Sequence, residues 1–416
     1  MALEDIFSRV KQARRRLGLM ADADRNKILS EVADAIERNT DKLLVSNCKD
    51  LARMAEDNPM YDRLRLTDAR LKDIADAMRQ VSQLPSPLGH VQKHRVLENG
   101  MDFKRVSVPF GVIGVVFEAR PNVCFDVFAL CLKSGNACIL KCGKDAIDSC
   151  LAAVDLIHDV LRKAGVDPDI VALLPATHEA TGALLCATGY VDLCIPRGGK
   201  RLIEFVRDTA KVPVIETGAG VVHCYFDKEG DDAIGRDIIF NAKTRRPSVC
   251  NALDCLLVHA DRLEDLPALC RPMADKNVKL HADERATAVL KGQYPEELLV
   301  KADDDDTWQT EWLSFQMGVK TVDSVDEAIA HIDRYGSGHS ESIVTEDMES
   351  ARKFQSLVDA ACVYLNTPTS FTDGGQFGLG AEIGISTQKL GARGPMALEE
   401  MTTYKWLIEG HGQTRP

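Results

Sequence analysis

The chain has 416 residues, which is enough for two or three domains with substantial cores. A net charge of −12 argues against nonspecific nucleic-acid binding, and no segment reaches the roughly 18 apolar residues that a membrane-spanning helix needs. The N-terminus lacks the continuous apolar stretch of a secretory signal, and the thirteen cysteines include no CxxC pair. We therefore expect a cytoplasmic protein with reduced cysteines, without a bound metal and without nucleic-acid or membrane partners.

The N-terminal region is predicted to be helical. Apolar residues recur at helical spacing from Ile28 to Ile36, a second helix contains Leu43 and Leu51, and a third covers 71–81. These helices carry no recognisable chemistry, so we interpret them as packing elements.

A β-hairpin is predicted next, over 95–108, with Asn99-Gly100 at its centre. Asn-Gly favours a two-residue turn in which both residues have positive φ. Because an isolated hairpin is only marginally stable in water, it should pack on something else, either its own surface or a partner subunit. The C-terminal β segment 402–408 is expected to pair with this hairpin or with a neighbouring chain.

From Gly111 onward, apolar strands alternate with helices. The predicted strands of the first unit are 111–117, 136–141, 170–174, 191–195 and 212–216. A second α/β unit begins near Asp231, with strands at 253–259, 341–344 and 361–366. This alternation predicts an α/β protein with two doubly wound parallel sheets, in which ligands bind at the carboxyl ends of strands.

Cys250 is the candidate nucleophile. Residues 231–240 are predicted to form an amphipathic helix, and Pro247 prevents its continuation, so Cys250 falls on a turn before strand 253–259. The cations Lys243, Arg245 and Arg246 are close in sequence and would favour the thiolate. The alternative is that Cys250 is a small buried hydrophobic residue.

Two loops after predicted strands carry polar residues suited to anionic ligands. In the first, Asn122 is placed to donate a hydrogen bond to an oxyanion and Arg120 to hold an anion, although asparagine after proline is also a common turn residue. In the second, Lys141 and Lys144 suit a phosphate-bearing ligand.

Glycines mark two further loops. Gly198 and Gly199, after Arg197, open a predicted helix at 202–210 where a pyrophosphate can approach backbone amides. The usual GxGxxG pattern is absent from this position. The run 372–385 is dense in glycine, as in loops that line a ligand.

With these residues in view, the chain resembles the γ-glutamyl phosphate reductase family of the aldehyde dehydrogenase-like superfamily over essentially its whole length. The most specific matching segments are 111–122 (GVIGVVFEARPN), 132–143 (LKSGNACILKCG), 195–200 (IPRGGK), 241–251 (NAKTRRPSVCN) and 372–405, which includes GGQFGLGAEIGISTQKLGARGP.

The resemblance implies NADPH-dependent reduction of L-glutamate 5-phosphate to L-glutamate 5-semialdehyde, the second step of proline biosynthesis. Cys250 matches the nucleophile that forms a thioester, and Asn122 matches the oxyanion asparagine. The positions that match or lie near the family's cofactor site are Lys141, Lys144, Arg197, Gly198, Gly199, Glu216 and Glu311. The candidates for binding the substrate's phosphate and carboxylate are Arg120, Arg246, Asn366 and Thr369.

The resemblance also implies a domain arrangement. Residues 1–228 would bind NADP, interrupted by a hairpin at 93–109, and residues 229–385 would carry Cys250. Residues 386–416 would form a return segment and an oligomerisation strand. A homo-oligomer is expected, with possible transient contact with glutamate 5-kinase.

Two departures from the family pattern are notable. Cys142 and Gly143 follow Lys141 where the family has a sequence close to RGG, and Ser370 stands where the family has arginine.

Two other functions stay open. One is a hydrolytic aldehyde dehydrogenase, in which Glu216 would activate water, and the other is a noncatalytic dinucleotide-binding protein.

Overall fold

The structure is a computed structural model that describes residues 3–58, 60–302 and 304–415. It divides into two compact units. Unit 1 contains residues 1–217, 378–384 and 396–416, and unit 2 contains residues 218–377 and 385–395. Among the described residues, no helix combines the length and apolarity that crossing a membrane requires.

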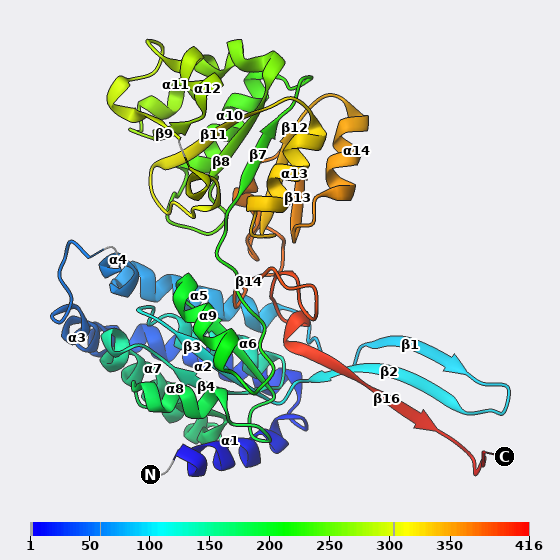
Figure 1. Cartoon of the computed structure of the whole chain (residues 1–416). Coiled ribbons are helices and arrows are strands. Elements are labelled where there is room, and N and C mark those ends of the chain that lie inside the picture. The colour runs from blue at the N-terminus through cyan, green and yellow to red at the C-terminus, as the bar shows by residue number, and fades with distance from the viewer. Residues whose placement is uncertain (1–2, 59, 303, 416) are drawn as a thin grey trace. The chain divides into compact units, whose positions relative to one another are not determined.

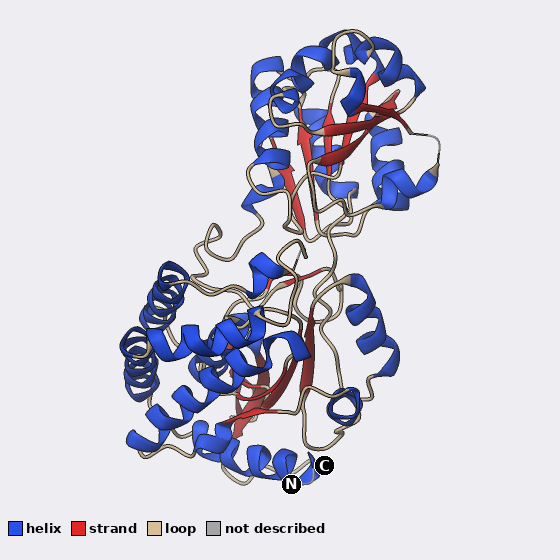
Figure 2. Ribbon diagram, turned by 90° about the vertical axis from the view of Figure 1, so that its left-hand side faces the viewer, coloured by secondary structure: helices blue, strands red, loops and turns tan. Residues whose placement is uncertain are grey.

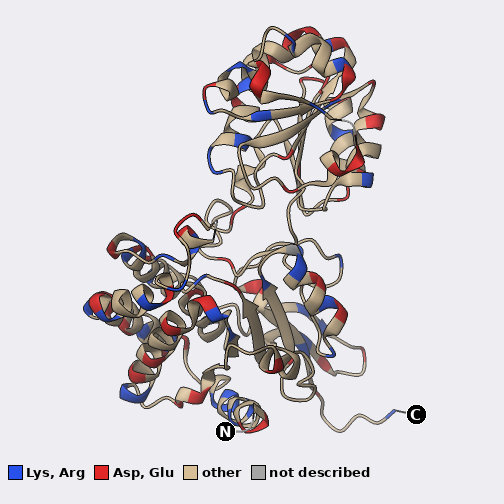
Figure 3. Ribbon diagram, turned by 60° about the vertical axis from the view of Figure 1, so that its left-hand side comes forward, with Lys and Arg blue, Asp and Glu red and all other residues tan. Residues whose placement is uncertain are grey.

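Unit 1 is built on a parallel sheet of four strands in the order β5-β4-β3-β6. Helices lie on both faces of the sheet (Figure 2), and every residue of β3 and β4 is buried. Charged residues lie mostly on helices and loops (Figure 3). The strands are β3 Val112–Phe117, β4 Ala137–Lys141, β5 Val171–Leu173 and β6 Leu193–Arg197. Because the chain proceeds from β3 to β4 and β5 on one side and returns as β6 on the other, the strand order reverses between β3 and β6.

The predicted N-terminal helices are confirmed. The apolar stripe of α2, which includes Ile28, Val32 and Ile36, is buried, and Thr67 caps α5 by accepting a hydrogen bond from the amide of Arg70. The helices of unit 1 are α1 Leu3–Leu17, α2 Asp22–Arg38, α3 Thr40–Leu51, α4 Tyr61–Leu64, α5 Asp68–Gln83, α6 Val123–Lys133, α7 Ile147–Lys163, α8 His178–Leu185 and α9 Lys200–Thr209.

A three-stranded antiparallel arm extends from the rest of unit 1 (Figure 1). It consists of β1 Val91–Val96, β2 Asp102–Pro109 and β16 Thr402–Glu409, so the predicted pairing of the C-terminal segment with the hairpin is confirmed. The predicted two-residue turn is wrong. Gly100 has a φ of +82°, but Asn99 is not among the residues with positive φ, and the loop spans 97–101, closed by the Leu97 amide on the Met101 carbonyl.

The predicted strand 212–216 is also wrong. Only Val214 forms a bridge, to Cys194. The Cys194 amide donates to the Pro213 carbonyl at 2.8 Å, and the Ile215 amide donates to the Cys194 carbonyl at 3.1 Å. Pro213 has no amide for the next bond of the ladder, so the pairing stays a single bridge.

Unit 2 contains a parallel sheet of seven strands in the order β10-β9-β11-β8-β7-β12-β13. The strands are β7 His223–Phe226, β8 Cys255–His259, β9 Lys279–Ala282, β10 Leu299–Lys301, β11 Gln316–Val322, β12 Ser340–Val344 and β13 Cys362–Leu365. A short ladder, β14 Ile385–Ser386 with β15 Gly394–Pro395, completes the unit. The two parallel sheets confirm the predicted fold class.

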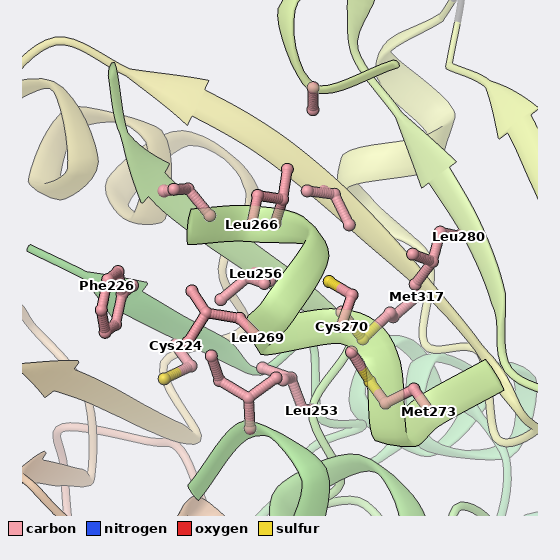
Figure 4. Close-up of a cluster of buried hydrophobic side chains, with 14 of the residues drawn as sticks. Cys224, Phe226, Leu253, Leu256, Leu266, Leu269, Cys270, Met273, Leu280 and Met317 are labelled. Atoms are coloured by element: carbon pink, nitrogen blue, oxygen red, sulfur yellow. The ribbon is translucent and has the colours of Figure 1, made fainter. Parts of the chain in front are cut away.

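The two faces of this sheet carry separate cores. Cys224, Phe226 and Leu256 pack with Leu269 and Cys270 (Figure 4), whereas the intervening residues belong to a second core that includes residues of α13 and α14. The helices of unit 2 are α10 Asp232–Thr244, α11 Leu266–Ala274, α12 Glu284–Leu290, α13 Val325–Tyr335 and α14 Met348–Leu357.

The helix before the candidate nucleophile is longer than predicted. α10 continues to Thr244, whose hydroxyl donates to the Phe240 carbonyl at 2.7 Å. Ile238 and Ile239 are buried as expected, but Ile234 is 43% exposed and does not join the core.

Candidate active site

Cys250 lies half-buried on a turn between α10 and β8, as the sequence predicts. Gly220, just before β7, packs directly on its backbone, and a Cβ at Gly220 would overlap the Cys250 carbonyl oxygen. Glycine is therefore the residue that this close approach allows. The turn is anchored further along by the Leu253 amide, which donates to the Ala242 carbonyl at 3.0 Å.

Lys243, one of the cations predicted to favour the Cys250 thiolate, contacts the segment after the turn. Its buried ammonium donates to the Leu253 carbonyl at 2.8 Å and lies 3.9 Å from Asp254 Oδ1. Burial lowers the pKa of Lys243 and raises the pKa of Asp254, while each charge partly offsets the effect on the other. Lys243 therefore ties the end of α10 to the segment after Cys250. Arg245 and Arg246 are exposed.

Glu311 is brought to the same loop. Its Oε1 accepts the Gly220 amide at 3.1 Å, so the carboxylate is held against the residue that packs on Cys250. The next amide, of Trp312, donates to Asp254 Oδ1 at 3.0 Å. Cys250, Gly220 and Glu311 thus form one connected group within unit 2.

The segment after β13 braces the Cys250 loop from another side. Thr369 is fully buried, and its hydroxyl donates to the Asn251 carbonyl at 2.9 Å. The Asn251 amide group donates to the Thr372 carbonyl at 3.0 Å. Ser370, at the position of the family arginine, donates to Asn241 Oδ1 at 2.8 Å. These contacts position the backbone next to Cys250.

Asn366 is not part of this group. It has a φ of +51°, and its side chain makes two hydrogen bonds of 3.0 Å with the backbone of Thr345, at the carboxyl ends of β13 and β12. Cys250 instead precedes β8, at the amino end of that strand. A substrate-binding role for Asn366 stays a prediction.

In unit 1, Asn122 stands at the start of α6 and its amide donates to Asp126 Oδ2 at 2.8 Å. An amide group has two hydrogens, so this bond uses only one of them. Burial raises the pKa of Asp126, and the positive charges of Arg197 and Arg120 oppose the shift. Sequence reasoning missed Asp126, although its i+4 spacing from Asn122 is a usable signal. Ala119, before Arg120, has a φ of +36°, a strained value for a residue other than glycine.

The loops after β3, β4 and β6 meet where the strand order reverses. Lys141 at the end of β4 is buried, and among the described residues it has no ion pair or hydrogen bond from its ammonium. Burial lowers its pKa, with Glu118 acting in the opposite direction. The Gly199 amide at the first turn of α9 donates to Glu118 Oε2 at 3.3 Å, and nothing lies within 4 Å of a Cβ placed on Gly199. A buried cation without an ion pair at the end of β4 and a helix start after β6 are groups that suit a dinucleotide phosphate.

The other predicted cofactor residues have the following places in unit 1. Lys144 is exposed and starts a short 3₁₀ helix. Gly198 packs closely on the Glu118 carboxylate. Glu216 Oε2 lies 4.0 Å from Arg207 Nη1 of α9, on a segment that is not a strand.

Comparison with known proteins defines the class. The model of the aldehyde dehydrogenase family matches residues 2–290 and 275–407, and the chain belongs to that family. An acetylating aldehyde dehydrogenase from Geobacillus thermoglucosidasius, 15% identical over 100% of this chain and 97% of that chain with a TM-score of 0.72, shares the fold.

Within this family the chain belongs with the gamma-glutamyl phosphate reductases. Those of Bacteroides thetaiotaomicron and Bacteroides fragilis are 59% and 58% identical, over 99% and 100% of both chains, respectively. The crystal structure of gamma-glutamyl phosphate reductase from Thermotoga maritima matches with a TM-score of 0.95 at 38% identity and covers 100% of both chains. The resemblance found in the sequence is confirmed.

Proposed function

We propose that the chain reduces L-glutamate 5-phosphate to L-glutamate 5-semialdehyde and phosphate, with NADPH as the reductant, in the second step of proline biosynthesis. The observation that carries this proposal is full-length similarity to gamma-glutamyl phosphate reductases at up to 59% identity. A half-buried cysteine on a braced turn is consistent with it.

In the proposed reaction, the Cys250 thiolate attacks the acyl carbon of the substrate. The carbon–sulfur bond forms, the bond to the phosphate oxygen breaks, and phosphate leaves. Asn122 donates a hydrogen bond to the oxyanion while Asp126 holds its amide. NADPH, when bound, supplies the hydride that converts the thioester to the aldehyde, and Cys250 then leaves as the thiolate.

We assign cofactor binding to the strand-end loops of unit 1 and to Glu311. Lys141 supplies a buried positive charge, and the Gly199 region supplies backbone donors at the start of α9. Arg197, Gly198, Lys144 and Glu216 complete the proposed set.

Two arginines are the strongest candidates for the substrate's anionic groups. Arg246 is exposed beside the Cys250 turn, and the described residues give it no ion pair. Arg120 lies in the loop that also carries Asn122. Thr369 and Asn366 are weaker candidates because their side chains are already hydrogen-bonded within the chain.

We further propose that the enzyme works in the cytoplasm as a homo-oligomer, with transient contact with the kinase that makes its unstable substrate. Hydrolytic aldehyde dehydrogenase activity is not favoured, because the full-length relatives at 54–59% identity carry the name of the reductase.

A coupled assay tests the function. Glutamate, ATP, NADPH and glutamate 5-kinase are mixed with the chain, and NADPH oxidation is followed by absorbance. We expect oxidation that requires both the kinase and Cys250, so that Cys250→Ala abolishes turnover while NADPH binding persists. Oxidation at the same rate without the kinase, or near-wild-type activity in Cys250→Ala, would contradict the proposal.

A further inference from the structure

A second group of reactive side chains lies in unit 2, outside the Cys250 loop. His223 begins β7, Cys255 begins β8, and His331 lies on α13. One potential ligand atom from each lies within 4.8 Å of the other two, and Cys255 Sγ is 3.9 Å from His331 Nε2. All three side chains are buried, with His223 fully so.

The sheet itself aligns this group. Glu341 of β12 pairs in register with His223, His223 pairs with Cys255, and Cys255 pairs with Gly318 of β11. Residues in one such row project from the same face of a parallel sheet. Gly318 adds no side chain to the row, and the Trp308 ring lies 3.2 Å from where its Cβ would be. The row therefore lies against His331 of α13 and the Trp308 ring.

Hydrogen bonding leaves one ligand atom unused. Glu341 Oε2 accepts the His223 amide at 2.7 Å and lies 3.0 Å from His223 Nδ1. His223 Nε2 is buried and has no hydrogen-bond partner among the described residues. A buried polar atom without a partner calls for a bound water or ion. A carboxylate that fixes one imidazole nitrogen while the other faces a cluster of ligands is the usual outer shell of a metal-binding histidine.

We propose that His223, Cys255 and His331 bind a Zn²⁺ ion, with Glu341 orienting His223. Two imidazoles and one thiolate are a ligand set that zinc favours, and a fourth position remains for water. The ion would join α13 to the first residues of β7 and β8. It would thus be a structural feature of unit 2, separate from the proposed reductase chemistry.

Cobalt(II) is the probe for this site, because a cobalt–thiolate bond gives a near-ultraviolet absorption band. The full chain carries Cys250→Ala, so that the half-buried thiol does not contribute, and is produced in minimal medium supplied with Co²⁺. Loading during folding avoids the need for an entry path into a buried site. We expect about one cobalt per chain after gel filtration, with the thiolate band present.

Matched variants locate the ion. Cys255→Ala and His331→Gln should remove the band and the bound cobalt, whereas Cys270→Ala should keep both. Cys270 is also a buried cysteine of unit 2, but it belongs to the core on the other face of the sheet (Figure 4). Substoichiometric cobalt in the Cys250→Ala chain, or undiminished binding in Cys255→Ala, would overturn the proposal.

A measurement without substitutions at the site covers the case in which those variants do not fold. X-ray absorption of the zinc-loaded Cys250→Ala chain should show one sulfur at about 2.3 Å and two nitrogens at about 2.0 Å. A shell made only of oxygen and nitrogen would exclude Cys255 as a ligand and contradict the site.

Discussion

The geometry around Cys250 depends on Gly220, which has no reactive side chain and so is not found by a search for catalytic residue types. Gly220 touches the Cys250 carbonyl on one side and donates to Glu311 on the other. Backbone contacts therefore position Cys250, whereas the neighbouring Lys243 is hydrogen-bonded to the Leu253 carbonyl.

Gly220→Ala tests this contact. The added methyl group would overlap the Cys250 carbonyl oxygen, so the turn must move, and we expect kcat to fall by about 100-fold, as for a misplaced reacting group. Gly182→Ala, in helix α8 where nothing lies within 4 Å, should retain activity. Equal kcat values in the two variants would refute a positioning role for Gly220.

Substitutions of Asn122 and Asp126 test the oxyanion assignment. Asn122→Ala should lower kcat by about 10²–10³-fold, since it removes an oxyanion donor. Asp126→Asn should cause a smaller loss, because it leaves the donor and weakens only its orientation. The rate of Cys250 alkylation should be unchanged in both. A wild-type kcat in the Asn122→Ala variant would contradict the assignment of Asn122 as an oxyanion donor.

His339 predicts a pH effect on stability. It is fully buried, its Nδ1 lies 2.7 Å from Ser340 Oγ, and burial lowers its pKa to about 4. Between pH 4 and about 6.5 the unfolded chain therefore binds more protons at this residue than the folded chain. The stability that the folded chain gains from keeping His339 neutral and buried is therefore complete above about pH 6.5. It is lost as the pH falls towards 4.

His339→Gln removes that proton uptake. Urea unfolding between pH 5 and 6 should show that wild type loses about 1.4 kcal/mol per pH unit more than the variant does. Exposed His411→Gln serves as the control and should follow the wild-type profile. Parallel profiles for wild type and His339→Gln would show that His339 does not titrate this way.

At the scale of elements, periodicity predicted the N-terminal helices, α10 and the strands of the unit 1 sheet, because apolar residues at fixed spacing must face a core. In unit 2 it predicted β8, β12 and β13 but missed β7, β9, β10 and β11. Elsewhere, prediction failed where one residue changed the hydrogen bonding. Pro213 prevents a fifth strand in unit 1, and the Asn99-Gly100 turn is wider than the two-residue type. The group of His223, Cys255 and His331 was not predictable, since register between distant strands brings it together.

The arm of β1, β2 and β16 is the element that we expect to mediate assembly. Its two outer strands leave edges unpaired, and Tyr404, Trp406 and Ile408 are all about half exposed. Apolar groups of this size on an extended arm favour burial against another copy.

Ile408→Asp should weaken that association. We expect sedimentation to give an oligomer for the wild type and a shift towards monomer for this variant, because a carboxylate is costly to bury. Leu19→Asp is a matched control, since Leu19 is 91% exposed outside the arm. A wild-type chain that is monomeric at every concentration would contradict the proposed assembly.

At the scale of the whole molecule, the sequence predicted two α/β domains and placed a boundary at 228, with a return at 386. The structure instead divides the chain after Thr217, and residues 378–384 and 396–416 join unit 1. The glycine-rich run 372–385 contains the crossings before 378 and after 384 and has no hydrophobic period, so nothing in its pattern marks where the chain changes units there. The division of labour between the two units stays a prediction.

The central claim is that phosphate, and not water, is the acyl acceptor of the Cys250 thioester when the reaction runs in reverse. A hydrolytic enzyme needs a base for water, and Glu216 is the residue predicted for that role. In an acyl-phosphate reductase the step is phosphate attack, for which we propose Arg246 and Arg120 as the sources of positive charge.

The most direct test is oxidation of glutamate 5-semialdehyde with NADP⁺ in phosphate-free buffer, followed by titration with phosphate or arsenate. We predict that NADPH formation beyond the first turnover depends on the added anion and changes only modestly in Glu216→Gln. Multiple turnovers without phosphate, lost in Glu216→Gln, would contradict the account and identify a hydrolytic dehydrogenase.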